Sequence, residues 1–100
     1  MEQYLYKLKL KPQYLQEENW TDKENEIVQR HFMRLKDLTE KGTVILAGRT
    51  LNEDETQFGI VIIEVESEQE AQKLMEDDPA VSEGVMDSAL YPYQVALMRE

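Results

Sequence analysis

The 100-residue chain contains no cysteine, a single histidine, and only three prolines and four glycines. Without cysteine it can form neither disulfides nor thiolate metal sites. One histidine with scattered carboxylates is a poor ligand set for zinc or iron, so we predict no metal site and no cofactor. Long apolar runs are also lacking, and no segment approaches the roughly 20 apolar residues that span a membrane. Because the N-terminus does not look like a signal peptide, we expect a cytoplasmic protein.

Charge is strongly one-sided. The chain has 21 acidic and 11 basic residues and a formal net charge of -10. A surface of this sign repels phosphate backbones and anionic lipids, so we expect no nucleic-acid partner and no membrane partner. The hydrophobic and charged fractions, 41% and 32%, are those of an ordinary globular protein, and we predict one domain over residues 1–100.

The N-terminal residues alternate between apolar and polar side chains, a pattern typical of a strand with one buried face. We predict a strand over residues 2–11, ended by Pro12, and a loop over residues 13–20. The buried face would carry Tyr4, Tyr6, Leu8 and Leu10.

A long helix is predicted next. Thr21 and Glu24 have the spacing of a capping box, in which each residue binds the backbone amide of the other. Gly42 is a natural stop, so the helix should end near Lys41. Its apolar stripe consists of Ile27, Val28, Leu35 and Leu38.

Two strands over residues 43–51 and 57–66 follow, and the turn N-E-D-E-T between them predicts an antiparallel hairpin. The second of these strands is apolar on both faces. Since a strand with one solvated face alternates between apolar and polar residues, this strand should be covered on both sides.

The C-terminal third begins with a second capping box at Ser67, which opens a short helix over residues 67–77. Residues 80–84 are predicted to form a turn, and residues 88–98 the last strand. Pro92 within that strand favours a position at the edge of the sheet.

The predicted order of elements is β-α-β-β-α-β. With right-handed crossovers it gives an α+β, ferredoxin-like fold, in which two helices cover one face of a four-stranded antiparallel sheet. The other face would remain an exposed apolar surface, and we assign Val61, Ile63 and Val65 to it, together with alternating residues of the last strand. A homodimer formed by face-to-face sheet packing, a dimeric α+β barrel, would bury this surface.

His31 lies in the middle of the apolar stripe of the long helix when residues are placed 100° apart. A buried imidazole needs polar partners. The same projection of the short helix places Asp78 on its apolar side and Asp77 on the opposite side. We therefore predict that Asp77 faces water and that Asp78 meets His31.

Such a pair has two interpretations. A carboxylate that holds one imidazole nitrogen leaves the other free to remove or return a proton, as in general acid–base catalysis. The pair could equally be structural and hold two helices together. Arg49, at the end of a strand, could bind a carboxylate substrate or form a surface salt bridge.

Two segments resemble the YCII-related (YciI-like) family: R-H-F-M-R-L-K-D-L-T-E-K-G-T-V-I-L-A-G and S-E-Q-E-A-Q-K-L-M-E-D-D-P-A-V-S-E-G. The last strand, with its Tyr-Pro-Tyr sequence, also fits. The resemblance implies a dimeric α+β barrel of ferredoxin-like protomers with an active site at His31 and Asp78. Some members of the family resemble muconolactone isomerases, and related proteins eliminate chloride from chlorinated aromatic intermediates. The chain departs from the pattern at Arg49, where proline often stands, and in its longer segment 12–26 with Trp20.

The leading hypothesis is a small enzyme-like protein in which His31 is the general base or acid, Asp78 orients it and Arg49 holds an anionic group. The reaction would be isomerisation or elimination on a small organic acid or lactone, without metal or redox cofactor. One alternative is a non-catalytic homodimeric module that binds a small ligand or a protein, with a structural His31. Another is a monooxygenase of the related dimeric barrel type, in which the substrate itself reacts with oxygen.

Overall fold

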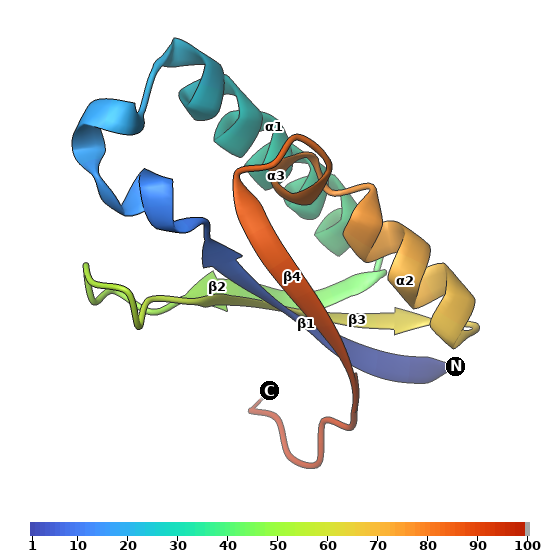
Figure 1. The fold of residues 1–100 in the computed structure, drawn as a ribbon. Coiled ribbons are helices and arrows are strands. Elements are labelled where there is room, and N and C mark those ends of the chain that lie inside the picture. The colour runs from blue at the N-terminus through green and yellow to red at the C-terminus, as the bar shows by residue number, and fades with distance from the viewer. Residues whose placement is uncertain (100) are drawn as a thin grey trace.

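Four strands form a single antiparallel sheet in the order β2-β3-β1-β4, and the helices lie on one of its faces (Figure 1). This strand order is that of the ferredoxin-like fold, so the predicted fold class is confirmed. The computed structural model describes residues 1–99. Its elements are β1 (Glu2–Leu10), η1 (Pro12–Leu15), η2 (Glu17–Asn19), α1 (Asp22–Glu40), β2 (Val44–Arg49), β3 (Gly59–Val65), α2 (Glu68–Glu76), α3 (Pro79–Ser82) and β4 (Met86–Tyr93).

The long helix α1 begins and ends where its capping residues predict. The Thr21 side chain accepts a hydrogen bond from the backbone of Lys23, and Glu24 accepts one from the Thr21 amide at 3.0 Å, which completes the capping box. Gly42 has a φ of 87°, a left-handed conformation that glycine adopts without steric cost. The two ends fix which side chains of α1 face the sheet.

Two regions differ from their predicted structure. The predicted loop 13–20 contains two 3₁₀ turns, η1 and η2, and the Trp20 indole donates to the Tyr14 carbonyl at 2.7 Å. The predicted turn 80–84 overlaps a short helix, α3. Both segments are held by local hydrogen bonds, which leave no long periodic pattern in the sequence.

The last strand is shorter than predicted, because β4 ends at Tyr93 and residues 94–99 lie outside the sheet. Tyr93 pairs with Gln3 of β1, and β1 begins at Glu2. Beyond Tyr93 almost no neighbouring strand remains to pair with. The Val95 amide donates instead to the Gln3 side chain at 2.8 Å. Pro92 does lie in an edge strand, as predicted.

The core lies between the helices and the sheet, and it corrects one prediction. Val61, Ile63 and Val65 face the helices and are almost completely buried. Their partners across the ladder include Tyr4 and Tyr6, which are buried in the same cluster. Residues opposite one another in an antiparallel pair share a face, so this register decides which face is covered. The helix-free side of the sheet, here called the open face, carries Leu5, Leu46, Ile60, Ile62, Ala89, Tyr91 and Tyr93.

Among residues 1–99, none of the helices has both the length and the apolar character that crossing a lipid bilayer requires.

Candidate active site

The position of Asp78 follows from the sequence Asp-Asp-Pro. Proline disfavours helical dihedrals in the residue before it, so α2 ends and Asp78 is extended, with φ −62° and ψ 125°. Pro79 then occupies the first turn of α3, where its missing amide hydrogen costs nothing. Asp78 becomes the N-cap of α3, whereas Asp77 is the exposed C-cap of α2. The two acids face different ways, as predicted.

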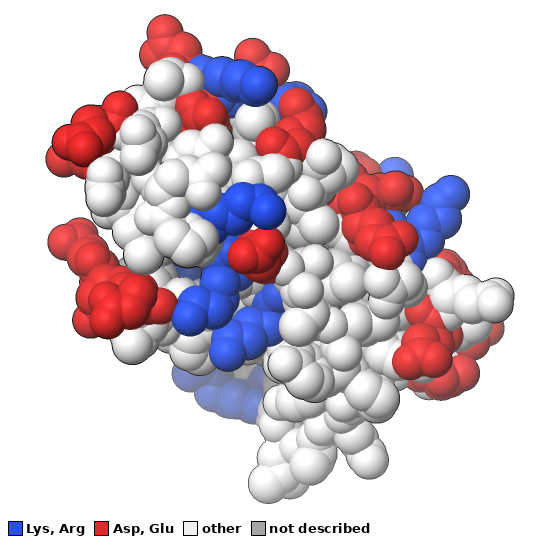
Figure 2. Space-filling view, viewed as in Figure 1, with Lys and Arg blue, Asp and Glu red and all other residues white. Residues whose placement is uncertain are grey.

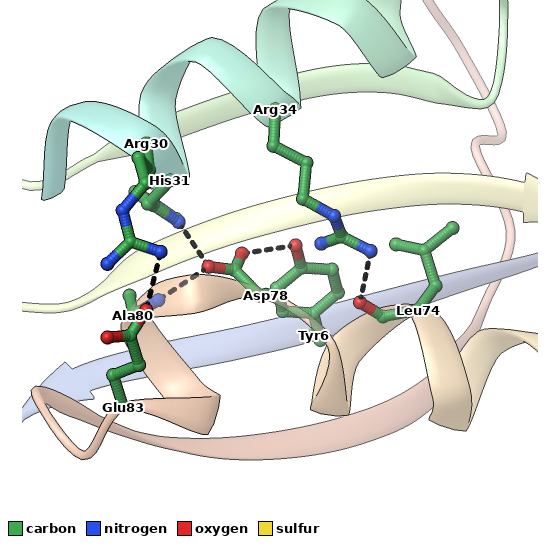
Figure 3. Close-up of polar contacts among 8 residues, drawn as sticks. All are labelled: Tyr6, Arg30, His31, Arg34, Leu74, Asp78, Ala80 and Glu83. Atoms are coloured by element: carbon green, nitrogen blue, oxygen red, sulfur yellow. Dashed lines mark hydrogen bonds and ion pairs between the residues drawn. The ribbon is translucent and has the colours of Figure 1, made fainter. Parts of the chain in front are cut away.

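Asp78 is completely buried, and its carboxylate accepts hydrogen bonds from three sides (Figure 3). Oδ1 contacts His31 Nδ1 at 2.6 Å and accepts from the Ala80 amide at 3.0 Å. Oδ2 accepts from the Tyr6 hydroxyl at 2.9 Å. The three partners come from α1, α3 and β1, so the carboxylate joins elements that are far apart in the sequence. The predicted contact between His31 and Asp78 is present.

The Asp78 contact determines how His31 can act. An ionised carboxylate only accepts hydrogen bonds, so Nδ1 carries the proton of the neutral ring and donates it to Asp78. Nε2 then keeps its lone pair. Among residues 1–99 no side chain or backbone group forms a hydrogen bond with Nε2. The side chain is 14% exposed, which leaves it reachable but mostly shielded from water.

His31 lies in the wall of a cavity of about 580 Å³ between α1 and the β2–β3 part of the sheet. The cavity lies over a part of the sheet that α2 and α3 leave uncovered. Its lining is mainly apolar and includes Leu8, Val28, Phe32, Leu35, Phe58, Val61 and Met86. This size and lining are typical of a site for a small organic molecule.

Arg49 lines the same cavity from the end of β2. Its side chain is exposed. Within residues 1–99 it makes no ion pair, so no partner for the alternative surface salt bridge is found there. Lys36 and Glu40 of α1 also border the cavity. The structure thus brings Arg49 and the His31–Asp78 pair to one cavity. Their catalytic and binding roles stay predictions.

Two residues of the network were missed by the sequence reasoning. The alternating pattern places Tyr6 on a buried face, in the core or at a pocket, and does not indicate that its hydroxyl binds Asp78. Arg34 was not considered, although it lies three residues after His31 and therefore on the same side of the helix. Its Nη2 donates to the Leu74 carbonyl at 3.0 Å. A buried tyrosine usually needs a partner for its hydroxyl, and that rule was the available signal for Tyr6.

Metal ligands do not gather at this site. Over residues 1–99, no three side chains of the types His, Cys, Asp and Glu come together as a group that could hold a metal ion. The only imidazole is already bound to Asp78 through Nδ1.

The fold and the cavity define a ferredoxin-like α+β domain with a buried aspartate–histidine pair at a small-molecule-sized pocket. The family model of the YCII-related domain matches residues 3–93, and the chain belongs to this family. The match includes β1, which lies before the segments that carry the sequence resemblance.

Among solved structures, the chain is similar to 5-chloro-2-hydroxyhydroquinone dehydrochlorinase (TftG) from Burkholderia phenoliruptrix AC1100, in complex with 2,5-dihydroxybenzoquinone. The TM-score is 0.68 and the sequence identity 20%, over 92% of this chain and 93% of that one. At this identity the likeness shows the fold. A comparison with curated protein sequences gave no significant match.

Proposed function

We propose that this protein is a small cytoplasmic enzyme that moves a proton on a small organic acid or lactone, in an isomerisation or an elimination. His31 is the general base or acid, Asp78 orients its ring, and Arg49 binds an anionic group of the substrate. The proposal rests on the different surroundings of the two nitrogens of the His31 imidazole. His31 lies in the wall of the cavity, its Nδ1 is bound to a buried carboxylate, and its Nε2 has no hydrogen-bond partner among residues 1–99.

The chemistry requires one proton acceptor and a polarised substrate. Nε2 takes a proton from a carbon next to a carbonyl group, and the electrons of the broken C–H bond move into the carbonyl system. The ring is then an imidazolium, and its positive charge is stabilised by Asp78. In an isomerisation Nε2 returns the proton at another carbon. In an elimination the electron pair expels a leaving group such as chloride. Neither route changes the overall oxidation level, so no redox cofactor is needed.

The charges around the cavity favour an anionic substrate. The chain as a whole is acidic, with a net charge of -10, yet the cavity is lined by two cations, Arg49 and Lys36, against one acid, Glu40. An arginine without an ion-pair partner can bind a carboxylate or an acidic hydroxyl with two parallel hydrogen bonds. The apolar walls and the rings of Phe32 and Phe58 suit a flat or hydrocarbon-rich body.

The proposal is tested by hydrogen exchange from heavy water into muconolactone and a panel of small carboxylic acids and lactones, followed by proton NMR. We expect saturable exchange at the carbon next to the carbonyl. His31→Gln should slow it by about 100-fold or more, because proton transfer by a positioned side chain contributes at least that much. Arg30→Gln is the matched control, since Arg30 is the preceding residue of α1 and pairs with Glu83 at 2.5 Å.

Binding is measured separately with 2,5-dihydroxybenzoquinone. Because the chain has one histidine, a sample labelled with nitrogen-15 histidine gives signals from His31 alone. We expect the Nε2 signal to shift on titration, and Arg49→Gln to weaken binding by about tenfold or more. The non-catalytic alternative is favoured if no compound exchanges and the His31 signals do not move.

We also propose that the protein forms a homodimer by face-to-face packing of two open faces. This face presents Leu5, Ile60 and Tyr91, and Tyr91 is 49% exposed. In Figure 2 the acidic side chains lie mostly around the rim, while a broad uncharged area covers the lower part of β4 and the chain beyond it. A surface of this kind is a candidate for association with a second copy.

Sedimentation velocity at micromolar concentration tests this assembly. The wild-type chain should sediment as a dimer, and Tyr91→Glu should shift it toward the monomer because it places a charge in the packed surface. Met33→Glu is the control, since Met33 is similarly exposed but lies on α1. A wild-type monomer, or equal effects of both variants, would contradict the proposed packing.

A further inference from the structure

Two residues outside the cavity lining, Tyr6 and Arg34, extend the contacts of the buried Asp78 carboxylate. Tyr6 is completely buried in β1, and its hydroxyl donates to Oδ2 of Asp78 at 2.9 Å. This bond occupies the oxygen that His31 does not use. With the Ala80 amide on Oδ1, it leaves the carboxylate one orientation, in which Oδ1 faces the His31 ring.

Arg34 lies on the other side of the Tyr6 hydroxyl. In Figure 3 its guanidinium points toward the end of the Tyr6 ring, and Nη2 donates to the Leu74 carbonyl. That carbonyl belongs to the last turn of α2, where carbonyls lack helical partners. Nη1 is buried and, among residues 1–99, has no hydrogen-bond partner of good geometry. A buried guanidinium nitrogen without a partner is costly, which calls for an explanation.

The electrostatics give that explanation. Burial and the neighbouring Asp78 carboxylate raise the pKa of Tyr6, whereas Arg34 opposes the rise. The hydroxyl therefore keeps its single proton. Because a cation stands on one side and an anion on the other, that proton points to Asp78 and the oxygen lone pairs point to Arg34. The cation thereby sets the direction of the hydroxyl.

The negative charge of Asp78 also points to a role for Arg34. While His31 is neutral and ready to accept a proton, it gives Asp78 a hydrogen bond but no positive charge. A fully buried carboxylate is costly without a compensating cation. Arg34 is the cation beside Tyr6, and the Tyr6 hydroxyl is bound to Asp78.

We propose that Tyr6 and Arg34 are positioning residues for the His31–Asp78 pair, in a relay that runs from guanidinium to hydroxyl to carboxylate to imidazole. The relay rests on the proposed function, because it assigns a purpose to holding Nδ1 protonated and Nε2 free. It holds the Asp78 carboxylate in one orientation and charged before His31 accepts a proton. Substitution of Tyr6 or Arg34 should therefore change the His31 tautomer ratio or the exchange rate of its Nδ1 proton while leaving the fold intact.

The test is the nitrogen-15 spectrum of the single histidine in Tyr6→Phe and Tyr4→Phe. Both changes remove one hydroxyl from a buried tyrosine on the same strand and face. The Tyr4 hydroxyl donates to Glu2 at 2.7 Å and has no link to Asp78. We expect Tyr6→Phe to change the ratio of the two imidazole tautomers by about tenfold and to speed exchange of the Nδ1 proton with water. Tyr4→Phe should leave both unchanged.

Arg34→Met and Arg30→Met form a second pair on α1. Methionine keeps much of the aliphatic stem and removes the charge, and Arg30 pairs with Glu83 and Glu26 rather than with Tyr6. We expect only Arg34→Met to speed exchange of the Nδ1 proton, and Arg34→Lys to restore it in part because lysine returns the charge. Circular dichroism checks that each variant is folded.

The relay is overturned if folded Tyr6→Phe and Arg34→Met give the wild-type His31 spectrum, or if the control variants change it equally. Neither result depends on activity. Should the His31 signals respond as expected while the wild-type protein exchanges no substrate proton, the relay stands and the proposed function fails. A wild-type His31 spectrum in variants that lose exchange activity would refute the relay and leave the proposed function intact.

Discussion

Among residues 1–99 two carboxylates are buried, Glu24 at the start of α1 and Asp78 at the start of α3, and their surroundings are alike. Glu24 completes the capping box of α1 and Asp78 is the N-cap of α3, and each accepts a hydrogen bond from a tyrosine hydroxyl, from Tyr14 at 3.0 Å and from Tyr6 at 2.9 Å. Burial and hydrogen bonding are therefore not what distinguishes them.

The difference is the third partner. Thr21 supplies the remaining donors to Glu24, from its amide and its hydroxyl, and these groups keep their protons. Asp78 instead meets His31, which lines a cavity and whose Nε2 has no hydrogen-bond partner among residues 1–99, so that the ring can accept and return a proton there. The same capping chemistry thus gives a structural site at one helix and a candidate active site at the other.

The largest expected difference between the two carboxylates is in activity. Asp78→Asn replaces an acceptor-only group that receives three donors with an amide that has one oxygen and is itself a donor. It also removes the negative charge that would stabilise a protonated His31. We expect exchange of hydrogen into muconolactone, or into whichever compound of the panel reacts, to fall about 10³- to 10⁴-fold, as for aspartates in catalytic triads.

Glu24→Gln is the matched change at the other carboxylate. It also replaces one carboxylate oxygen with an NH₂ group. Because Glu24 does not contact His31, exchange activity should remain close to wild type. Comparable losses in the two variants would mean that the amide change acts by loosening the fold. The contrast between the sites would then disappear.

A second difference is expected in stability. Asp78→Ala leaves three donors without an acceptor in a fully buried position, so the free energy of unfolding should fall by about 3–5 kcal/mol. Thr21→Ala removes the N-cap of α1 at an exposed residue and should cost only about 1 kcal/mol. Urea denaturation of both variants measures the two losses. Similar losses would show that Asp78 matters to the fold mainly as another helix cap.

How far the sequence predicts these sites depends on the range of the interactions. The capping box at Thr21, the stop at Gly42 and the break at Pro79 are local, and each is present. The direction of Asp78 was predicted correctly for an incomplete reason. The helical projection treats Asp78 as a continuation of α2, whereas in the structure Pro79 ends that helix and Asp78 is the N-cap of α3.

The missed features depend on register between distant segments. That Tyr6 reaches Asp78 requires β1 to lie beneath α3 at one particular residue, and no local pattern contains that information. The face to which Val61 and Ile63 belong follows from pairing with β1, because β3 is apolar on both sides. The end of β4 depends on where β1 begins.

The smallest expected effect is in the acid range and concerns Glu24 alone. The Thr21 hydroxyl, followed by the Thr21 amide and the Tyr14 hydroxyl, lowers the pKa of Glu24 to about 2 from its ordinary value of 4.5, against the opposing effect of burial. A depressed carboxyl pKa adds stability that is fully present above the unfolded value. This stability is lost as the pH falls from about 4.5 to about 2. Glu24→Gln removes this titration, so its melting temperature should depend less steeply on pH over that interval. Parallel melting curves for the two proteins would show that Glu24 titrates alike when folded and unfolded.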